Sequence, residues 1–306
     1  MHQLPADIVA LDTSHLGRAE IICCYLIRGS VNILVDPGPT VCIPALGREL
    51  QRYGLTFAHI GAIILTHIHL DHGGAVGVLL RDYPQMTLYV HERGVPHLVD
   101  PTKLLASATR IYGDQMDVLW GAFEAVPAAR IVALQGDETL IIGDQTFAVL
   151  PAPGHAIHHL MYVRSSDRVA FVGDMAGIRM PGYRYVRPAT PPPDIDLDAW
   201  DASLDRLRAA HPSVICLTHY GPIFDIEPHL ATLQAANWRW AHLVRDWTAQ
   251  GLDAAEQLRL LTAQATADMG DEATDLGISA YQKGASITMS QQGLARYWQK
   301  RTPTNP

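Results

Sequence analysis

The chain has 306 residues, of which 48% are hydrophobic and 18% charged. This balance excludes the charge-rich, apolar-poor composition of a disordered protein and allows one large domain with an appendage, or two compact domains. The formal net charge of −8 argues against nucleic acid or an anionic membrane surface as a partner, because both attract clustered lysine and arginine, so we expect a small-molecule substrate.

Short apolar runs bounded by Gly, Pro, Asp or Ser fill the first two thirds of the chain and predict strands. Segments at about 40–54, 73–82, 117–126 and 198–210 are predicted to be helices, which gives a mixed α/β pattern with helices flanking the sheets. The predicted strands lie in EIICCYLIRG, VNILVD, GAIILTH, TLYVHE, RIVAL, TLIIG, TFAVLPAPGH, HLMYVRS, RVAFVGD and SVICLTH.

After Pro228 the pattern becomes helical. Apolar residues recur at three- or four-residue spacing up to Gly251, and Asp253 followed by Glu256 resembles a capping box that opens a second helix. We therefore divide the chain into a catalytic domain at 1–227 and a C-terminal helical extension at 228–306. Residues 179–196, rich in Pro and Arg, are predicted to form a long ordered loop.

The N-terminus has no basic stretch followed by an apolar run, and no apolar segment approaches the ~20 residues needed to span a bilayer. The four cysteines lack CxxC spacing, so they are expected to be free thiols. These features predict a cytoplasmic protein. They leave the oligomeric state open, with a homodimer as one option.

The segment GAIILTHIHLDHGG, residues 61–74, is an apolar strand followed by four potential metal ligands. His67 and His69 are two residues apart and can therefore point the same way, whereas Asp71 and His72 lie at the turn into a helix and can face a second metal. We expect the two glycines that follow to let the backbone pass close to the metals. The alternative is a turn with solvated histidines, but HxHxDH after a strand is among the more specific metal motifs.

This motif resembles the first motif of the metallo-β-lactamase superfamily. The resemblance implies an α/β fold, the αβ/βα four-layer sandwich, and three further ligands at the ends of later apolar runs. His155, Asp174 and His219 stand at these places. In the family, the residues matching His67, His69 and His155 hold one metal, those matching Asp71, His72 and His219 hold another, and the one matching Asp174 bridges the two.

The bridging aspartate is similar to that of glyoxalase II-like thioesterases, lactonases and phosphodiesterases, and true β-lactamases lack it. The resemblance therefore implies a binuclear hydrolase whose metal-bridging hydroxide attacks an ester, thioester or lactone carbonyl, with Asp71 as the catalytic group that orients the nucleophile and carries its proton. Acyl-homoserine lactonases have a tyrosine where this chain has Gly177, which argues against that activity. The cofactors implied are two divalent ions, zinc first, with manganese or iron also suited to these ligands.

Two alternatives remain open. The same centre could cleave a phosphodiester, or the chain could be a non-enzymatic metal-binding module whose cleft is sealed by residues 179–196 or by the C-terminal helices.

Several residues are candidates for supporting the metals or binding substrate. Asp36 could orient a ligand imidazole or simply form the turn before Pro37. Of His158 and His159, which face opposite sides of a strand, at most one should face the cleft. Tyr220 could lean into the cleft or pack in the core. The cluster on the loop after Asp174 could bind an anionic substrate or pair with the acidic segment that follows; it comprises Arg179, Tyr183, Arg184, Tyr185 and Arg187.

Overall fold

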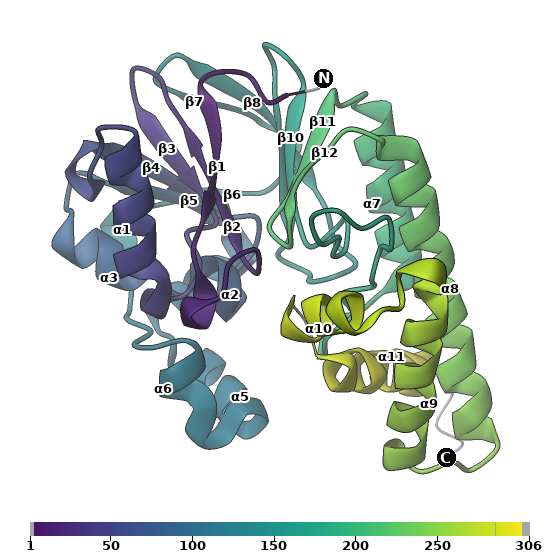
Figure 1. Cartoon of the computed structure of the whole chain (residues 1–306). Helices are drawn as coiled ribbons and strands as arrows, with labels where there is room; N and C mark the ends of the chain where they lie inside the picture. Colours follow the sequence, from purple (N-terminus) through teal and green to yellow (C-terminus); the bar gives the residue numbers. More distant parts are fainter. Residues whose placement is uncertain (1–2, 285, 302–306) are drawn as a thin grey trace.

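The computed structural model describes residues 3–284 and 286–301. Within these ranges the strands form two six-stranded sheets that lie face to face, with helices on both outer sides (Figure 1). This is the four-layer αβ/βα sandwich that the sequence predicts, and it carries a helical region at its C-terminal end.

The first sheet has the strand order β1-β2-β3-β4-β5-β6. Its first three strands are antiparallel, and β3 to β6 run parallel to one another. The strands are β1 (Ile8–Asp12), β2 (Cys23–Ile27), β3 (Asn32–Val35), β4 (Ile60–Ile64), β5 (Thr87–His91) and β6 (Ile131–Leu134).

The second sheet has the order β12-β11-β10-β9-β8-β7. Only β10 and β11 are parallel neighbours; the other pairs are antiparallel. Its strands are β7 (Thr139–Ile142), β8 (Gln145–Pro151), β9 (Leu160–Arg164), β10 (Val169–Gly173), β11 (Val214–Leu217) and β12 (Gly221–Ile223).

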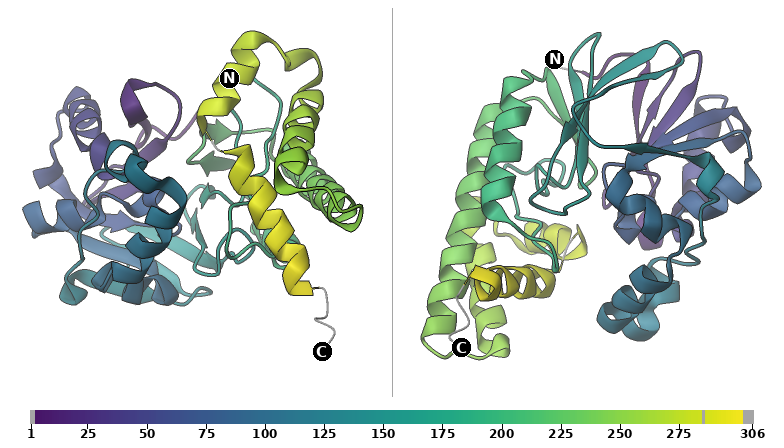
Figure 2. Two further views of the ribbon diagram at one scale, coloured as in Figure 1. Left: turned by 90° about the horizontal axis from the view of Figure 1, so that it is seen from below. Right: turned by 180° about the vertical axis from the view of Figure 1, so that it is seen from behind.

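The helices cover the outer faces of the sheets and extend below their lower edges (Figures 1 and 2). The α-helices are α1 (Ile43–Arg52), α2 (Leu70–Gly73), α3 (Val76–Asp82), α4 (Val95–Val99), α5 (Thr102–Tyr112), α6 (Met116–Leu119), α7 (Leu197–Ala209), α8 (Ile226–Ala249), α9 (Ala254–Asp268), α10 (Asp275–Gly284) and α11 (Ile287–Arg301). Single turns of 3-10 helix lie between them: η1 (His15–Gly17), η2 (Thr40–Cys42), η3 (Phe57–His59), η4 (Glu92–Gly94), η5 (Gly113–Gln115), η6 (Ala128–Arg130) and η7 (Gly270–Glu272). None of the helices in the described ranges is long and apolar enough to cross a bilayer.

The central strands of each sheet are buried on both faces, whereas β6, β7 and β8 also have exposed residues. Between the sheets lies a core to which Tyr25 and Val35 contribute from one side and Phe147 and Tyr162 from the other. The outer face of the first sheet packs against α1 and α3, and that of the second sheet packs against α7, α8 and the later helices. Strands buried on both faces read as continuous apolar runs, which is why their positions are visible in the sequence. The cysteines are buried free thiols.

The predicted C-terminal helices are present: α8 spans the long amphipathic segment, and the Asp253 side chain accepts a hydrogen bond from the Glu256 backbone at the start of α9. The helix predicted at 117–126 is wrong beyond Leu119, where the chain becomes irregular. The preceding helix α5 was not predicted, although Leu104, Ala108, Ile111 and Tyr112 recur at helical spacing. The edge strand β12 was not predicted, because it begins with Gly-Pro, a dipeptide that is typical of turns.

Candidate metal centre

The predicted ligands follow four strands whose ends meet at one edge of the sandwich. His67 lies three residues after β4, and His155 lies four residues after β8. Asp174 directly follows β10, and His219 lies two residues after β11. Because parallel neighbours end at the same edge of a sheet, this topology brings together residues that are up to 152 positions apart, from His67 to His219.

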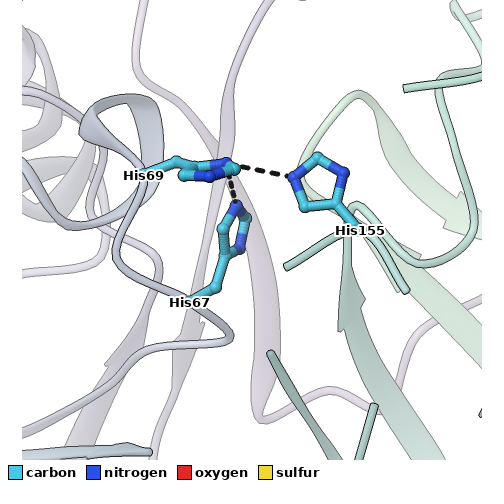
Figure 3. Close-up of side chains that lie close together, drawn as sticks. All are labelled: His67, His69 and His155. Atoms are coloured by element: carbon cyan, nitrogen blue, oxygen red, sulfur yellow. Dashed lines mark hydrogen bonds between the residues drawn. The ribbon is translucent and has the colours of Figure 1, made fainter. Parts of the chain in front are cut away.

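Three histidines form the first group of ligand atoms. The Nε2 atom of His67 lies 2.9 Å from His69 Nδ1, and His155 Nε2 lies 3.0 Å from the same His69 atom (Figure 3). Burial, followed by the neighbouring histidines, lowers the pKa of His67 well below its usual value and that of His69 to about 3. These imidazoles are therefore neutral near pH 7, which is the form that binds metal.

The second group comprises Asp71, His72 and His219. His219 Nε2 lies 3.3 Å from Asp71 Oδ2, and His72 Nε2 lies 3.9 Å from Asp71 Oδ1. Burial alone would lower the pKa values of His72 and His219, but the carboxylates of Asp174 and Asp71 outweigh it and raise both. The two groups thus differ in charge, because the first consists of neutral imidazoles, whereas the imidazoles of the second lie beside the carboxylates of Asp71 and Asp174.

Asp174 lies between the two groups. Its Oδ2 is 3.4 Å from His155 Nε2, and its Oδ1 is 3.2 Å from His72 Nε2 and 3.7 Å from His219 Nε2. Each carboxylate oxygen therefore faces a different group, which is the geometry of a bridging ligand.

The donor set fits two divalent cations. Three overlapping triads have ligand atoms within 4.8 Å of one another: His67 with His69 and His155, His67 with His72 and Asp174, and Asp71 with His72 and His219. Among the described residues, His72 Nε2 and Asp174 Oδ1 are buried without a hydrogen-bond partner. Orphaned buried polar atoms are costly, and a cation between them would satisfy both.

Asp36 lies beneath the second group. Its Oδ2 accepts hydrogen bonds from His72 Nδ1 at 2.9 Å and from the hydroxyls of Thr66 and Thr218 at 2.6 and 2.9 Å, and its Oδ1 accepts one from the Thr66 backbone at 2.8 Å. With Nδ1 donating to Asp36, the free nitrogen of His72 is Nε2, which points at Asp71 and Asp174. Asp36 thus lies where the sequence-based hypothesis of an orienting carboxylate requires.

The other ligand rings are held from behind in the same way. His155 Nδ1 is 2.8 Å from the carbonyl of Ala189, and His219 Nδ1 is 2.8 Å from that of Ile21. His159 is fully buried, and its Nε2 accepts a hydrogen bond from the Asp174 backbone at 3.3 Å. Contacts of this kind fix which nitrogen of each ligand is free.

Sequence reasoning did not identify Thr66, Thr218 or His159 as supporting residues. A signal for the threonines was present, because each precedes a ligand histidine in the repeated tripeptide Leu-Thr-His at the end of a strand. Alternation along the strand turns the threonine away from the metal side and toward Asp36.

Comparison with known proteins agrees with this geometry. The family model described as the metallo-beta-lactamase superfamily matches residues 18–219. The chain belongs to this superfamily. The superfamily comprises metal-dependent hydrolases, and the match includes every predicted ligand, from His67 to His219.

Individual relatives carry similar descriptions. The metallo-beta-lactamase fold-containing protein ST1585 of Sulfurisphaera tokodaii is 32% identical over 236 residues, which are 75% of this chain and 82% of the relative. A hydroxyacylglutathione hydrolase of Photobacterium profundum is 30% identical over 152 residues, but these are only 49% of this chain and 45% of that enzyme. The solved structure of the family protein TTHA1429 from Thermus thermophilus has a TM-score of 0.69 at 19% identity, covering 98% of this chain and 95% of that one, and shows the shared fold.

In this superfamily member four of the seven ligand residues line a cavity of about 860 Å³. They are His69, Asp71, Asp174 and His219, and His158 lines it with them. Its walls come from α5, from the segment 187–194 and from α9 to α11, which lie below the two sheets on opposite sides (Figure 1). We expected at most one of His158 and His159 to face the cleft, and only His158 is in the cavity lining. The two residues lie in the turn before β9, however, and not on a strand.

Four other candidates lie outside this cavity. Arg179 forms an ion pair with Asp225 at 2.8 Å and donates a hydrogen bond to the Tyr183 carbonyl. The side chain of Arg184 is 73% exposed and forms ion pairs with Asp271 and Glu272. Tyr183 packs against Tyr281, and Tyr220 lies beside the core between the sheets. The cavity lining includes none of these four side chains and so lends no support to a substrate role for them. The acidic partners are Asp225, directly before α8, and Asp271 and Glu272 in η7, so the acidic segment that follows the loop does not supply them.

The predicted helix start at Gly73 also needs correction. Helix α2 already begins at Leu70, so the glycines end this short helix and do not start it. A Cβ at Gly74 would lie 2.4 Å from the Leu70 carbonyl oxygen and 3.0 Å from the Pro39 Cα, and one at Gly73 would lie 3.0 Å from Leu65 Cδ1. The glycines therefore allow close packing of the backbone behind the site.

Replacing Asp36 with Asn should weaken the second group of ligands without removing any of them. The amide keeps the size of the carboxylate but cannot accept all the hydrogen bonds from Thr66, Thr218 and His72, so His72 loses its orientation. We expect activity and metal affinity to fall about 10–100-fold. Steady-state kinetics and metal titration of Asp36→Asn measure both, and unchanged values would show that Asp36 only forms a turn.

Falling pH should empty the two groups in sequence. A proton competes with metal for the imidazoles of His72 and His219, whose pKa values are raised, at a higher pH than for those of His67, His69 and His155, whose pKa values are lowered. Metal content measured after dialysis at stepwise lower pH should therefore fall first to half, beginning near pH 6, and then to zero. Simultaneous loss of both metals, or full retention at pH 4, would contradict this order.

Proposed function

We propose that this superfamily member is a binuclear hydrolase of small carboxylic esters, thioesters or lactones. The observation that carries the proposal is the placement of Asp174, which lines a cavity and whose two oxygens face two separate groups of ligands. His67, His69 and His155 would hold one metal; Asp71, His72 and His219 would hold the other. Zinc is the first expectation, and manganese or iron would suit the same nitrogen and oxygen ligands.

Two divalent ions in these positions would lower the pKa of water toward neutrality and polarise a substrate carbonyl. The protein supplies the rest. Asp71 and His69 are the two partly exposed ligand residues, and 27% of the Asp71 side chain is exposed. The Asp71 carboxylate is held ionised because His72 and His219 outweigh the effect of burial on its pKa. We propose that Asp71 orients the nucleophile and accepts its proton.

The two proposed domains have different roles. Residues 1–227 contain every proposed ligand, and the extension at 228–306 contributes α9 to α11 to the cavity wall. Substrate choice is then set by these walls rather than by the ligands. The open connection between the cavity and Asp71 argues against the alternative of a sealed, non-enzymatic metal module.

The lining of the cavity favours a carbonyl substrate over a phosphodiester. Apolar side chains from both walls, such as Leu104, Ile111, Ile287 and Met289, suit a hydrocarbon chain better than a charged backbone. At Gly177, φ is +68° and a Cβ would lie 2.7 Å from the Arg187 carbonyl oxygen, so the tyrosine of acyl-homoserine lactonases has no room here. The hydroxyacylglutathione hydrolases among the relatives support a thioester, over part of the chain.

A substrate panel tests the proposal. The zinc- and manganese-loaded protein is assayed on acyl thioesters, 4-nitrophenyl esters, γ-lactones and bis(4-nitrophenyl) phosphate. Turnover of at least one carbonyl class, with kcat/KM above that for the phosphodiester, is expected. Faster turnover of the phosphodiester would favour the alternative activity, and no turnover with either metal would support the non-enzymatic reading.

A further inference from the structure

Arg187 is a buried arginine in the wall of the cavity that contains the metal ligands. Its side chain is 3% exposed, yet it lines the cavity together with His69, Asp71 and Asp174. In the part of the chain that the structure describes, no ion pair joins its guanidinium to a carboxylate. Its Nη1 donates a hydrogen bond to the carbonyl of Tyr281.

The other deeply buried arginine shows what is unusual here. Arg164 is also 3% exposed, but it is paired with Asp7 and Asp167. A guanidinium stays charged in proteins, and burying such a charge without a counter-charge is costly. Arg187 therefore has an unmet requirement for an anion, and the free space beside it is the cavity.

The backbone holds Arg187 close to the ligands. Residues 178 and 187 exchange two backbone hydrogen bonds, of 3.0 and 2.9 Å, and Ile178 lies four positions after Asp174. Two positions after Arg187, the Ala189 carbonyl lies 2.8 Å from His155 Nδ1. The segment is thus fixed to two proposed ligands. The hydroxyl of Thr190, also in the cavity wall, is buried without a hydrogen-bond partner.

We propose that Arg187 binds an oxyanion group of the substrate, a carboxylate or a phosphate, and so selects amphipathic substrates that carry this group together with an apolar chain. The planar guanidinium suits two-point binding of such an oxyanion, and the apolar walls of α5 and α11 receive the chain. This inference rests on the proposed hydrolase function, because it assigns the substrate class of the same site.

Ligand binding tests the inference independently of turnover. Calorimetric titrations of the metal-loaded protein with hexanoate, adipate and 6-phosphonohexanoate compare one chain length with and without a second anion, carboxylate or phosphonate. We expect at least one dianion to bind wild-type protein tenfold or more tightly than hexanoate, at about the strength of a charge-assisted hydrogen bond, and Arg187→Met to bind all three alike. The tighter dianion identifies the kind of oxyanion.

Kinetics provide the second measurement. The rates for 4-nitrophenyl hexanoate are compared with those for mono-4-nitrophenyl adipate and 3-carboxy-4-nitrophenyl hexanoate, which place the charge on the acyl or the leaving side. Arg187→Met should remove the preference for an anionic ester through KM, and Arg187→Lys should restore part of it. Lys103→Met, which removes an exposed cation from the same cavity, is the matched control and should keep the preference.

Two results would overturn the inference: equal binding of hexanoate and both dianions by wild-type protein, or an undiminished dianion preference in Arg187→Met. If Arg187→Met does not fold, Arg187→Lys tests the inference instead, because the ammonium group of lysine is a point charge and cannot bind an oxyanion at two points as the planar guanidinium does. A dianion preference as large as that of wild-type protein in Arg187→Lys would also overturn the inference. Failure of hydrolysis with intact dianion selectivity would instead refute only the proposed function.

Discussion

Replacing Asp71 with Asn should lower kcat about 10²–10⁴-fold while changing KM far less. The amide keeps the shape of the side chain but loses the charge that offsets His72 and His219 and the oxygen that can accept a proton. Both losses act on the transition state more than on substrate binding. The variant is compared with wild-type protein by steady-state kinetics at saturating metal.

The variants Asp36→Asn and Arg184→Ala are controls for the loss of kcat expected in Asp71→Asn. Asp36 contacts His72 from behind and does not line the cavity, so its replacement should be the milder of the two aspartate changes. Arg184 is exposed on the surface, and its removal should leave kcat and KM unchanged. If Asp36→Asn were as severe as Asp71→Asn, or more severe, the proton-transfer role would be misassigned.

Metal removal should abolish activity and lower the melting temperature. Without cations, the carboxylates of Asp36, Asp71 and Asp174 lie close together, and buried ligand atoms remain unpaired. Free metal at about a thousandfold above its Kd stabilises a folded protein by ~4 kcal/mol, or ~8 °C in melting temperature for a chain of this size. Thermal unfolding with and without chelator measures the shift, and readdition of zinc should restore both stability and activity.

A chelator can also act non-specifically, so the double variant His67→Ala/His155→Ala serves as the control. It lacks two ligands of the first group, and its melting temperature should respond less to zinc. An equal response in wild type and variant would mean that the stabilising metal binds elsewhere.

The ligand set could be predicted from sequence because its signals are local. His67, His69, Asp71 and His72 lie within six residues, and the remaining ligands each follow an apolar run. Strands buried on both faces read as unbroken hydrophobic stretches, so the strand positions were visible as well, and the family resemblance implied their arrangement as a sandwich. Asp36 became a candidate because it stands where the family resemblance places a carboxylate that orients a ligand imidazole.

The residues that line the proposed substrate cavity could not be predicted, since their positions depend on contacts between segments distant in sequence. Arg179 and Arg187 look alike in the sequence, yet Arg179 meets Asp225 whereas Arg187 is buried without an acidic partner. The apolar stripe of helix α5 was readable in the sequence, but the sequence does not show that it faces a cavity rather than a packed core. The function of such residues appears only when the chain is folded.

The number of metals per chain tests the central claim most directly. Protein saturated with zinc and freed of excess metal should contain two ions per chain by elemental analysis, because Asp174 presents one oxygen to each group of ligands. The double variant His67→Ala/His155→Ala should retain one. A wild-type value that stays near one after saturation would contradict a binuclear centre.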